Sequence, residues 1–276
     1  MTTTTNKITQ GRFRPRQLVG KYCVKRKVGD GAFAEVYAAT DTIEGIDVAL
    51  KIPRSEFVDE DLLSLFKREV RIVAKLDHPN ILPIKNADFI DGVFVVATKL
   101  ANETLHERLR RRIRVERSLD YFEQMIGAVA FAHRANILHC DIKPENFLIF
   151  ESDKVMLSDF GIAKIARQTV TGSGTGTVGY MAPEQAMGRP SMRSDVFSLG
   201  MIMFRMLSGC WPEYPFAWPP KGTINLRRRH VHPDLILFIR KAIAERPQHR
   251  FTDAIQMKRH YGAVYTTALN NLRRRR

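Results

Sequence analysis

The N-terminal part of the chain carries its apolar side chains in short runs, and in residues 22–28 they alternate with basic side chains. Because successive side chains of a strand point to opposite faces, this alternation predicts a half-buried β-strand. The other short runs also predict strands, and residues 48–52 are apolar except for Lys51. Asp91-Gly92, between the last two runs, is a hairpin signal. Residues 60–76 break the alternation with apolar side chains at i, i+3 and i+4, which predicts an amphipathic helix. The predicted strands cover residues 22–28, 35–39, 47–52, 84–89 and 93–98.

Helical spacing dominates from residue 104 onward. It predicts helices at residues 104–114 and 118–135, and the almost wholly apolar run 194–207 predicts a helix that is buried on all sides. Between these helices, short apolar runs predict strands on either side of a polar loop. These runs cover residues 137–138, 147–150 and 155–157.

The polar loop brings an acid, a cation and an amide together within residues 138–148, as Asp141, Lys143 and Asn146. A second acid, Asp159, follows the next predicted strand. Two carboxylates and an asparagine at neighbouring strand ends are oxygen ligands suited to Mg²⁺. Lys143 supplies positive charge where a phosphoryl group can be transferred. The loop therefore predicts a phosphate-and-magnesium site.

These motifs, followed by Gly-Thr-Val-Gly-Tyr-Met-Ala-Pro-Glu-Gln at 176–185, resemble a eukaryotic-type (Hanks-type) Ser/Thr protein kinase catalytic domain, in the style of its bacterial members. The resemblance implies an α+β, bilobal protein kinase fold. A small antiparallel sheet with one helix would form the N-terminal lobe, and the larger C-terminal lobe would be mostly helical. The implied boundaries are a flexible basic tail at 1–18, the kinase domain at 19–265 (N-lobe 19–97, hinge 98–100, C-lobe 101–265) and a basic tail at 266–276.

The resemblance also implies roles at the loop. Asp141 would orient the substrate hydroxyl and accept its proton, and Lys143 would stabilise the γ-phosphoryl group of ATP. Asn146 and Asp159 would hold Mg²⁺, with Mn²⁺ as an alternative metal. Thr177 would bond to Asp141 and Lys143 and shape the acceptor pocket.

By the same resemblance, Lys51 in the third strand would hold the α- and β-phosphates and pair with Glu69 in the predicted helix. Gly29 and Gly31 would belong to a glycine-rich loop over the phosphates, whose third glycine is replaced by Ala34. Taken alone, the glycines fit an ordinary hairpin turn equally well. The other residues implied to contact the nucleotide are Phe33, Val36, Ala49, Thr98, Leu100 and Leu148.

Residues 98–100 would connect the lobes and present backbone groups of Thr98 and Leu100 to the adenine edge. Ala97 would then lie at the back of the nucleotide pocket, where its small side chain leaves extra room. The alternative is that Ala97 is simply a core alanine.

The chain departs from the family pattern at Cys140, where most members carry arginine between the histidine and the aspartate. That arginine normally receives a phosphate of the activation segment. We therefore expect activity that does not require phosphorylation of this segment. We interpret Cys140 as a buried, inert thiol, and a redox-sensitive thiol is the alternative.

Three residues outside the loop complete the resemblance. Asp195 would cap its helix and hold the backbone around His139, and Arg250 would pair with Glu184. A scaffold or pseudokinase that binds nucleotide without turnover is the alternative function, and its usual mark is a missing lysine, aspartate or asparagine. This chain has all of them, as Lys51, Asp141, Asn146 and Asp159. A small-molecule phosphotransferase of related fold is disfavoured, because the segment at 176–184 belongs to a region that docks proteins.

Composition is that of an ordinary globular protein, with 44% hydrophobic and 26% charged residues among 276. No apolar run approaches the roughly 20 residues that span a bilayer, and the first residues lack the apolar segment of a secretory signal. The three separated cysteines (Cys23, Cys140 and Cys210) suggest neither disulfides nor a zinc site. A cytoplasmic location follows as an expectation.

The formal charge of +15 arises from 44 basic against 29 acidic residues and is clustered in arginine runs. Such runs are usually solvated, but they can also attract acidic protein substrates, anionic lipid or nucleic acid. No nucleic-acid-binding motif accompanies them, so nucleic acid would be an incidental partner. Glu145 matches a position that favours basic substrates in relatives, whereas Arg205 stands where those relatives have a second acid. We expect a protein substrate with a Ser/Thr acceptor in an acidic or neutral sequence, and no pattern indicates an oligomeric state.

Overall fold

The computed structural model describes residues 12–31, 33–54, 60–160, 179–213 and 216–274. Contacts between Cα atoms divide the chain into an N-terminal unit, Met1–Val70 with Pro83–Leu100, and a C-terminal unit, Arg71–Leu82 with Ala101–Arg276. Each unit is described by itself below.

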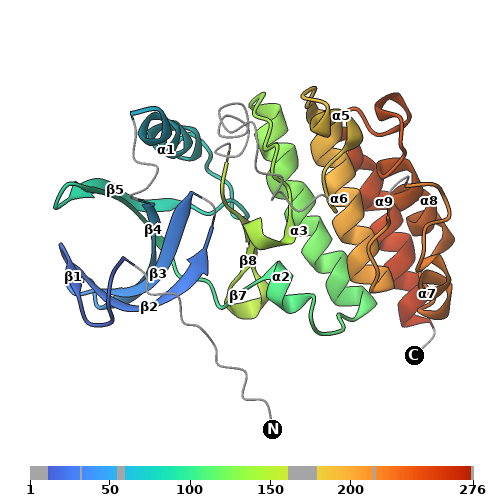
Figure 1. The fold of residues 1–276 in the computed structure, drawn as a ribbon. Helices are drawn as coiled ribbons and strands as arrows, with labels where there is room; N and C mark the ends of the chain where they lie inside the picture. The colour runs from blue at the N-terminus through green and yellow to red at the C-terminus, as the bar shows by residue number, and fades with distance from the viewer. Residues whose placement is uncertain (1–11, 32, 55–59, 161–178, 214–215, 275–276) are drawn as a thin grey trace, which may run out of the picture. The chain divides into compact units, whose positions relative to one another are not determined.

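A six-stranded antiparallel sheet forms most of the N-terminal unit, with the strand order β1-β2-β3-β4-β6-β5 (Figure 1). The five expected strands and the helix α1 are all present; each of the five strands extends beyond an expected end, and α1 ends at Val73, before the expected residue 76. The elements are β1 (Leu18–Val19), β2 (Tyr22–Asp30), β3 (Ala34–Asp41), β4 (Ile46–Pro53), α1 (Glu60–Val73), β5 (Ile84–Ile90) and β6 (Val93–Lys99).

The strand register places the core of this unit on one face of the sheet. Tyr37 of β3 lies opposite Leu50 of β4, which lies opposite Ala97 of β6, and all three are fully buried in one apolar cluster. Directly opposed residues share a face, so their neighbours along each strand point to the other face. The strand register therefore separates a core face from a second face.

The described part of the expected N-terminal tail packs on this sheet. The ring of Phe13 meets that of Tyr37 edge to face with centroids 5.6 Å apart, and the Arg12 amide donates to the Glu35 carboxylate at 3.2 Å. β1 then pairs with β2. Residues 12–18 therefore belong to the N-terminal unit, which differs from the expected flexible tail.

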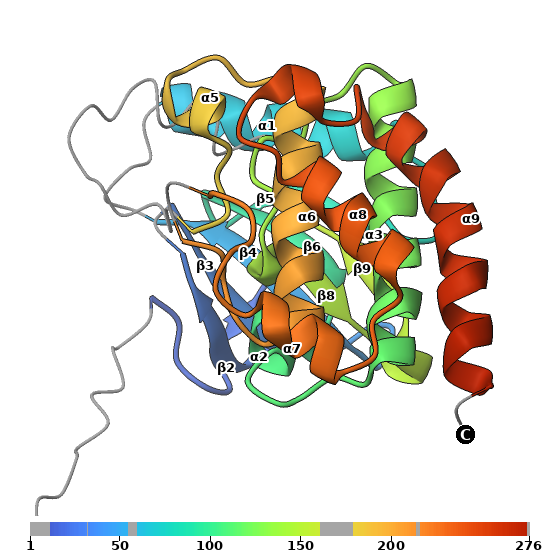
Figure 2. The same cartoon turned by 90° about the vertical axis from the view of Figure 1, so that its right-hand side faces the viewer.

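Long helices form the C-terminal unit, and α6 lies among the others (Figure 2). Gly200 allows α6 to approach α8 closely, since a Cβ at this position would lie 2.7 Å from the Cβ of Ala242. The helices are α2 (Leu105–Arg108), α3 (Val115–Arg134), α5 (Pro183–Ala186), α6 (Met192–Ser208), α7 (Thr223–Arg228), α8 (Pro233–Ala242) and α9 (Ala254–Arg273).

Two segments of this unit differ from the expected pattern. The helix expected at 104–114 ends at Arg108, and the apolar Ile113 is buried from a separate turn. A three-stranded sheet, β7 (Glu103–Thr104), β8 (Phe147–Ile149) and β9 (Val155–Leu157), flanks the polar loop. Residues 137–138, which were expected to form a strand, are irregular.

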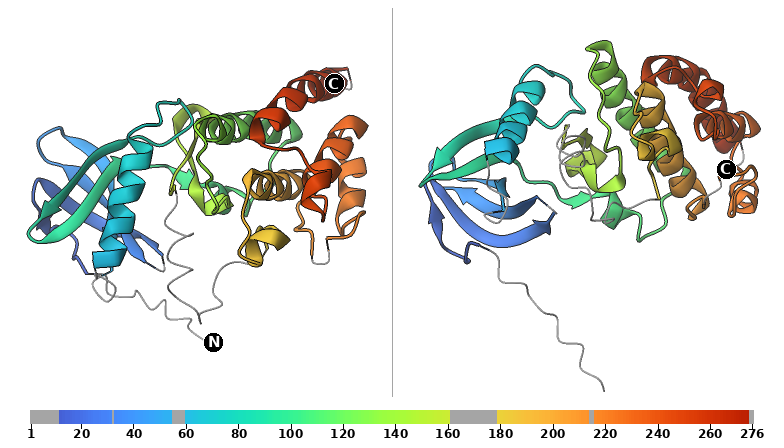
Figure 3. Two further views of the ribbon diagram at one scale, coloured as in Figure 1. Left: turned by 90° about the horizontal axis from the view of Figure 1, so that it is seen from above. Right: turned by 45° about the horizontal axis from the view of Figure 1, so that its top comes forward.

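The last helix, α9, continues to Arg273, past the expected domain end at 265. Figure 3 shows it alongside α3. Tyr261 donates its hydroxyl proton to the Leu119 carbonyl at 2.9 Å and Tyr265 donates to Asp120 at 2.8 Å, which fixes α9 on α3. No helix in the described part of the chain is sufficiently long and apolar to cross a membrane.

Candidate active site

The polar loop of the C-terminal unit holds Asp141, Lys143 and Asn146 within hydrogen-bonding distance. The Lys143 ammonium lies 2.7 Å from Asp141 Oδ2. The Asn146 amide donates to the Asp141 carbonyl at 2.8 Å and to Asp141 Oδ2 at 3.1 Å. A short 3₁₀ turn, Pro144–Asn146, makes this possible, because it folds Asn146 back toward Asp141. The loop therefore holds a carboxylate, an ammonium group and an amide in one compact cluster.

Asp195 of α6 fixes the backbone on the N-terminal side of this cluster. Its Oδ2 accepts the His139 amide and its Oδ1 accepts the Cys140 amide, both at 2.9 Å. His133 Nε2 also lies 3.0 Å from Oδ2. Because His133 Nδ1 accepts the Ala254 amide, the Nε2 atom carries the proton and donates it to Asp195.

Asp195 remains ionised in spite of its full burial. Burial, the largest influence, raises the pKa of this carboxyl, but the hydrogen bond from His133 and the nearby His139 outweigh it and the pKa is lowered overall. The expected role of Asp195 in holding the loop is confirmed. Its expected role as helix cap is wrong, since the N-cap of α6 is Ser191, whose amide donates to Ser194 Oγ.

A second set of contacts connects this loop to the segment that ends in Asp159. His139 Nε2 donates to the Ser158 carbonyl at 2.9 Å, and the His139 ring lies 4.8 Å from that of Phe160. The Ser158 amide donates to the Asn146 carbonyl at 2.9 Å. Asp159 has a left-handed backbone with φ of 62°, a conformation that costs about 1–2 kcal/mol outside glycine.

The donor set of this unit fits a hard cation. The side-chain hydrogen bonds of Asn146 use its N–H₂ group, and none among the described residues uses its Oδ1 atom. Together with the Asp159 carboxylate, this amide oxygen is a ligand type that Mg²⁺ prefers. No group of three or more His, Cys, Asp or Glu side chains suited to a metal occurs in the described part of the chain. A metal here would therefore depend on Asn146 and Asp159 with phosphate oxygens and water.

Cys140 is buried, with 5% of its surface exposed. Its backbone φ is 62°, and its carbonyl accepts the Gln185 side-chain amide at 2.6 Å. The interpretation of a buried cysteine is confirmed. Gln185, which sequence analysis did not single out, lies two residues after Pro183 and connects α5 to the loop.

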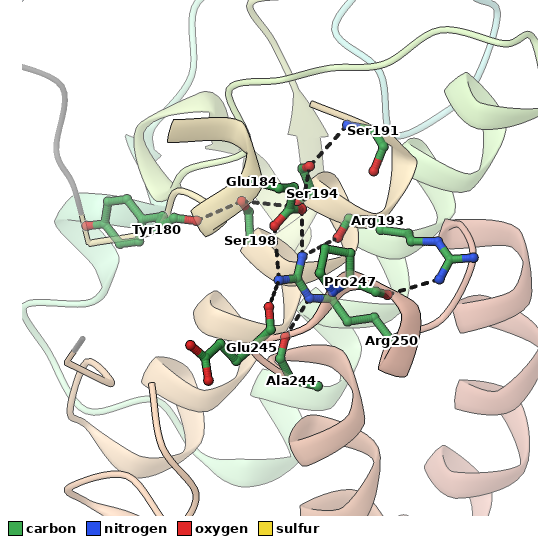
Figure 4. Close-up of polar contacts among 10 residues, drawn as sticks. All are labelled: Tyr180, Glu184, Ser191, Arg193, Ser194, Ser198, Ala244, Glu245, Pro247 and Arg250. Carbon is green, nitrogen blue, oxygen red and sulfur yellow. Dashed lines mark hydrogen bonds and ion pairs between the residues drawn. The ribbon is translucent and has the colours of Figure 1, made fainter. Parts of the chain in front are cut away.

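The expected pair of Glu184 and Arg250 is present and its guanidinium is fully satisfied (Figure 4). Arg250 donates to both Glu184 oxygens, at 2.8 and 3.1 Å. Its remaining N–H groups donate to the backbone carbonyls of Arg193, Ala244 and Glu245. Burial lowers the pKa of Arg250, and Glu184 opposes this shift. The pair fastens α5 to the segment that follows α8.

In the N-terminal unit the structure brings Lys51 and Glu69 together. The Lys51 ammonium lies 3.1 and 3.2 Å from the two Glu69 oxygens and 5.6 Å from the centre of the Phe66 ring. The side chains are 20% and 10% exposed, so the pair is largely shielded from water. This confirms the pairing between β4 and α1 that the resemblance implied.

The described part of the glycine-rich loop is held by Arg54, a residue that sequence analysis missed. The Gly31 amide donates to the Ala34 carbonyl at 2.9 Å and closes the turn. Arg54 Nε donates to the Gly31 carbonyl at 2.9 Å, and the Arg54 amide donates to the Phe33 carbonyl at 3.0 Å. Arg54 also pairs with Asp30. No motif marks Arg54, since only the sheet brings the end of β4 beside this turn.

The remaining expected contacts fall into three groups. Gly29 and Val36 are opposed across β2 and β3, and Leu100 directly follows β6. Leu148 lies in β8 of the C-terminal unit, half-buried against Leu82, Phe150 and Met156. Thr177 lies outside the described residues.

A family profile described as "Protein kinase domain" matches residues 22–261. The chain belongs to the protein kinase family. Serine/threonine-protein kinase PrkC of Bacillus subtilis is 32% identical over 263 residues, which covers 88% of this chain and 40% of that protein. Serine/threonine-protein kinase PknA of Mycobacterium tuberculosis is 35% identical over 227 residues, covering 78% of this chain and 52% of PknA. The chain thus spans about half or less of these relatives.

The fold of this kinase is also that of a solved structure. The crystal structure of the Mycobacterium tuberculosis PknI kinase domain matches with a TM-score of 0.68 at 23% sequence identity, over 91% of this chain and 99% of that one. The α+β protein kinase fold expected from the sequence, with its antiparallel sheet and one helix before a mostly helical part, is confirmed.

One expectation about the kinase's nucleotide pocket is wrong. Lys51 points away from the core face of the sheet, and Ala49 and Thr98, which are opposed across β4 and β6, share its face. Ala97 instead lies opposite Leu50 within the apolar core and is fully buried. It therefore cannot line the face that carries Lys51. Thr98 lies inside β6, which ends at Lys99, so the connector begins later than the expected 98–100.

This placement predicts opposite effects for neighbouring substitutions. Thr98→Met enlarges a side chain on the face of Lys51 and should raise the KM for ATP by about tenfold, equivalent to about 1.4 kcal/mol. Ala97→Val overpacks the core and should lower the free energy of unfolding by about 1–3 kcal/mol while leaving that KM unchanged. Steady-state kinetics and denaturant titration measure both. A change in the KM for ATP with Ala97→Val but not with Thr98→Met would contradict the placement of Thr98 on the face of Lys51 and of Ala97 in the core.

Proposed function

We propose that this kinase transfers the γ-phosphoryl group of ATP to Ser or Thr hydroxyls of proteins. The observation that carries the proposal is the cluster of Asp141, Lys143 and Asn146, held in place from α6 by Asp195. The Lys51–Glu69 pair supports it from the N-terminal unit. Positioned charges of this kind supply most of the catalysis in phosphoryl transfer, since little covalent chemistry is required of the protein.

In this proposal Asp141 orients the acceptor hydroxyl and takes its proton. Lys143, 2.7 Å from that carboxylate, stabilises the negative charge on the transferred group. Asn146 and Asp159 hold Mg²⁺, or Mn²⁺ as an alternative, and the metal when bound neutralises phosphate charge. Lys51, fixed by Glu69, holds the nucleotide phosphates.

Replacing Asp141 by asparagine should lower kcat by about 10²–10⁴-fold without a large change in affinity for ATP. Incubation with labelled ATP, Mg²⁺ and a generic protein substrate measures turnover, and calorimetry measures nucleotide binding. Asp91→Asn, in the exposed β5–β6 turn where asparagine is tolerated, is the matched control. A wild-type chain that binds ATP but transfers nothing would support the alternative, a pseudokinase or scaffold.

We propose that turnover does not require phosphorylation of the activation segment. Cys140 offers no cation to a phosphate, and the backbone of the catalytic loop is already held by Asp195 and Gln185. The candidate phosphorylation sites Thr169, Thr171, Ser173 and Thr175 lie outside the described residues.

The quadruple variant with alanine at these four positions should therefore retain turnover comparable to that of the wild type. Thr177→Ala is the companion variant and should lose activity, because the resemblance gives Thr177 a place in the acceptor pocket. Initial rates with the generic protein substrate decide the matter. Loss of turnover in the quadruple variant at unchanged thermal stability would reject the proposal.

We also propose that the substrate carries acidic or neutral residues near its acceptor. The half-buried Arg205 contacts Trp211 through its guanidinium, 5.7 Å from the ring centroid, and its Nε atom has no hydrogen-bond partner among the described residues. Glu145 Oε1 lies 2.8 Å from His106 Nδ1, and Glu145 Oε2 likewise has no hydrogen-bond partner among the described residues. Burial raises the pKa of Tyr180 to about 12, and Glu145 and Arg205 act on it with opposite sign, so both charges lie near this ring. The Arg205 cation, together with the net charge of +15, supports an acidic or neutral substrate sequence.

Arg205→Glu should shift selectivity from acidic toward basic peptides by about tenfold or more in the ratio of kcat/KM values, a difference of about 1.4 kcal/mol. A peptide array with acidic, neutral and arginine-rich sequences around one acceptor measures it. Arg240→Glu, an exposed residue of α8, changes the net charge equally and serves as control. Strong preference of the wild type for arginine-rich sequences would exclude the proposal.

We propose that the catalytic reaction takes place in the cytoplasm, where ATP is available. Cys23, Cys140 and Cys210 form no disulfide among the described residues, which supports a reducing environment.

A further inference from the structure

Two arginine-rich segments of the C-terminal unit, far apart in the sequence, lie side by side. One is the turn between α2 and α3, and the other is α7 with the residue that follows it. The Arg229 guanidinium donates to the Ile113 carbonyl, which joins the two directly. It also donates to the Met206 and Leu207 carbonyls at the end of α6, at 3.1 and 2.6 Å. Arg229 thereby anchors both segments to the unit. We call their outer surface the basic face.

The basic face carries a large unneutralised positive charge. Arg111 pairs with Glu103. Glu107 forms the capping box of α2 with Thr104, and the negative charge of Glu116 interacts with the Arg229 guanidinium. No ion pair with a described residue forms at the other exposed arginines, Arg110, Arg112, Arg114, Arg227 and Arg228. Figures 1 and 2 place the end of α9, with exposed Arg273 and Arg274, at the same end of this unit.

An exposed apolar side chain lies among these charges. Ile224 of α7 is 59% exposed and precedes Arg227 and Arg228 by three and four residues, so the three side chains share one side of the helix. An exposed isoleucine flanked by arginines is the arrangement by which an interfacial helix binds a bilayer, with the apolar residue entering the headgroup region and the cations meeting lipid phosphates.

We propose that the basic face binds the surface of an anionic phospholipid membrane. Arginine suits this role because its guanidinium binds phosphate with two parallel hydrogen bonds. Nucleic acid offers the same phosphates but is the poorer fit. The described residues of the basic face include no exposed aromatic side chain on which a base can stack. The apolar Ile224 side chain would also find no apolar surface to contact on a phosphodiester backbone. The basic face includes none of the residues assigned to catalysis, and the proposal is independent of the proposed function.

Co-sedimentation of the full chain with phosphatidylcholine vesicles, with and without phosphatidylglycerol, tests the proposal. The wild type should bind only the anionic vesicles and be released by high salt, because the attraction is screened. Arg227→Glu with Arg228→Glu should weaken binding by at least about tenfold. Arg240→Glu with Arg246→Glu, an equal charge change outside the basic face, should retain most of it. Arg110→Gln with Arg112→Gln is a second test pair should the first fail to fold.

Ile224→Ser distinguishes a membrane from nucleic acid. It should weaken vesicle binding severalfold and leave binding to a DNA oligonucleotide unchanged. All variants should keep the turnover and thermal stability of the wild type, since none of these residues belongs to the catalytic loop. The proposal would be overturned if the wild type bound neutral and anionic vesicles equally, or if the control pair lost as much binding as the Arg227/Arg228 pair. It would also be overturned if an oligonucleotide displaced the protein from vesicles and Ile224→Ser had no effect on vesicle binding.

Discussion

The hydrogen bonds accepted by Asp195 are the constraint on which the C-terminal unit depends. This carboxylate accepts hydrogen bonds from the His139 and Cys140 amides and from the His133 side chain, and Asp195 is only 1% exposed. Buried amides without a partner each cost about 1–3 kcal/mol, so the loop has little freedom to move away from α6. Its left-handed turn at Cys140, unfavourable for a non-glycine residue, persists because these contacts over-determine it. The positions of Asp141 and Asn146 follow from that turn.

His133 extends this constraint to the end of the chain. It donates to Asp195 through one ring nitrogen and accepts the first amide of α9 through the other. α9 is in turn fixed on α3 by Tyr261 and Tyr265. The polar loop, the central helix α6 and the last helix α9 are therefore parts of one hydrogen-bonded structure, although they lie far apart in sequence.

The arginines of this chain serve two physically different purposes. Arg250 is buried and Arg229 is half-buried, and both donate their N–H groups to carbonyls, with Arg250 also bound to a carboxylate, so they connect segments of the unit. Burial lowers the pKa of each, which shows that their charge is held at a cost in solvation. The arginines of the basic face remain in solvent and leave their charge available. Net charge alone does not separate these two groups, because only burial decides which role a guanidinium takes.

The sequence determined the strands, most of the helices and the residue types of the cluster of Asp141, Lys143 and Asn146, because short apolar runs and helical spacing record burial directly and because the loop motif is local. The pairings of Lys51 with Glu69 and of Arg250 with Glu184 came from the resemblance, since the sequence cannot measure distance. Tertiary structure decided which face of β6 each residue occupies: a shift of one position moves a side chain to the other face, and this placed Ala97 in the core. It also decided the contacts of Arg54, Gln185 and Arg229, which depend on segments meeting in space and leave no pattern along the chain.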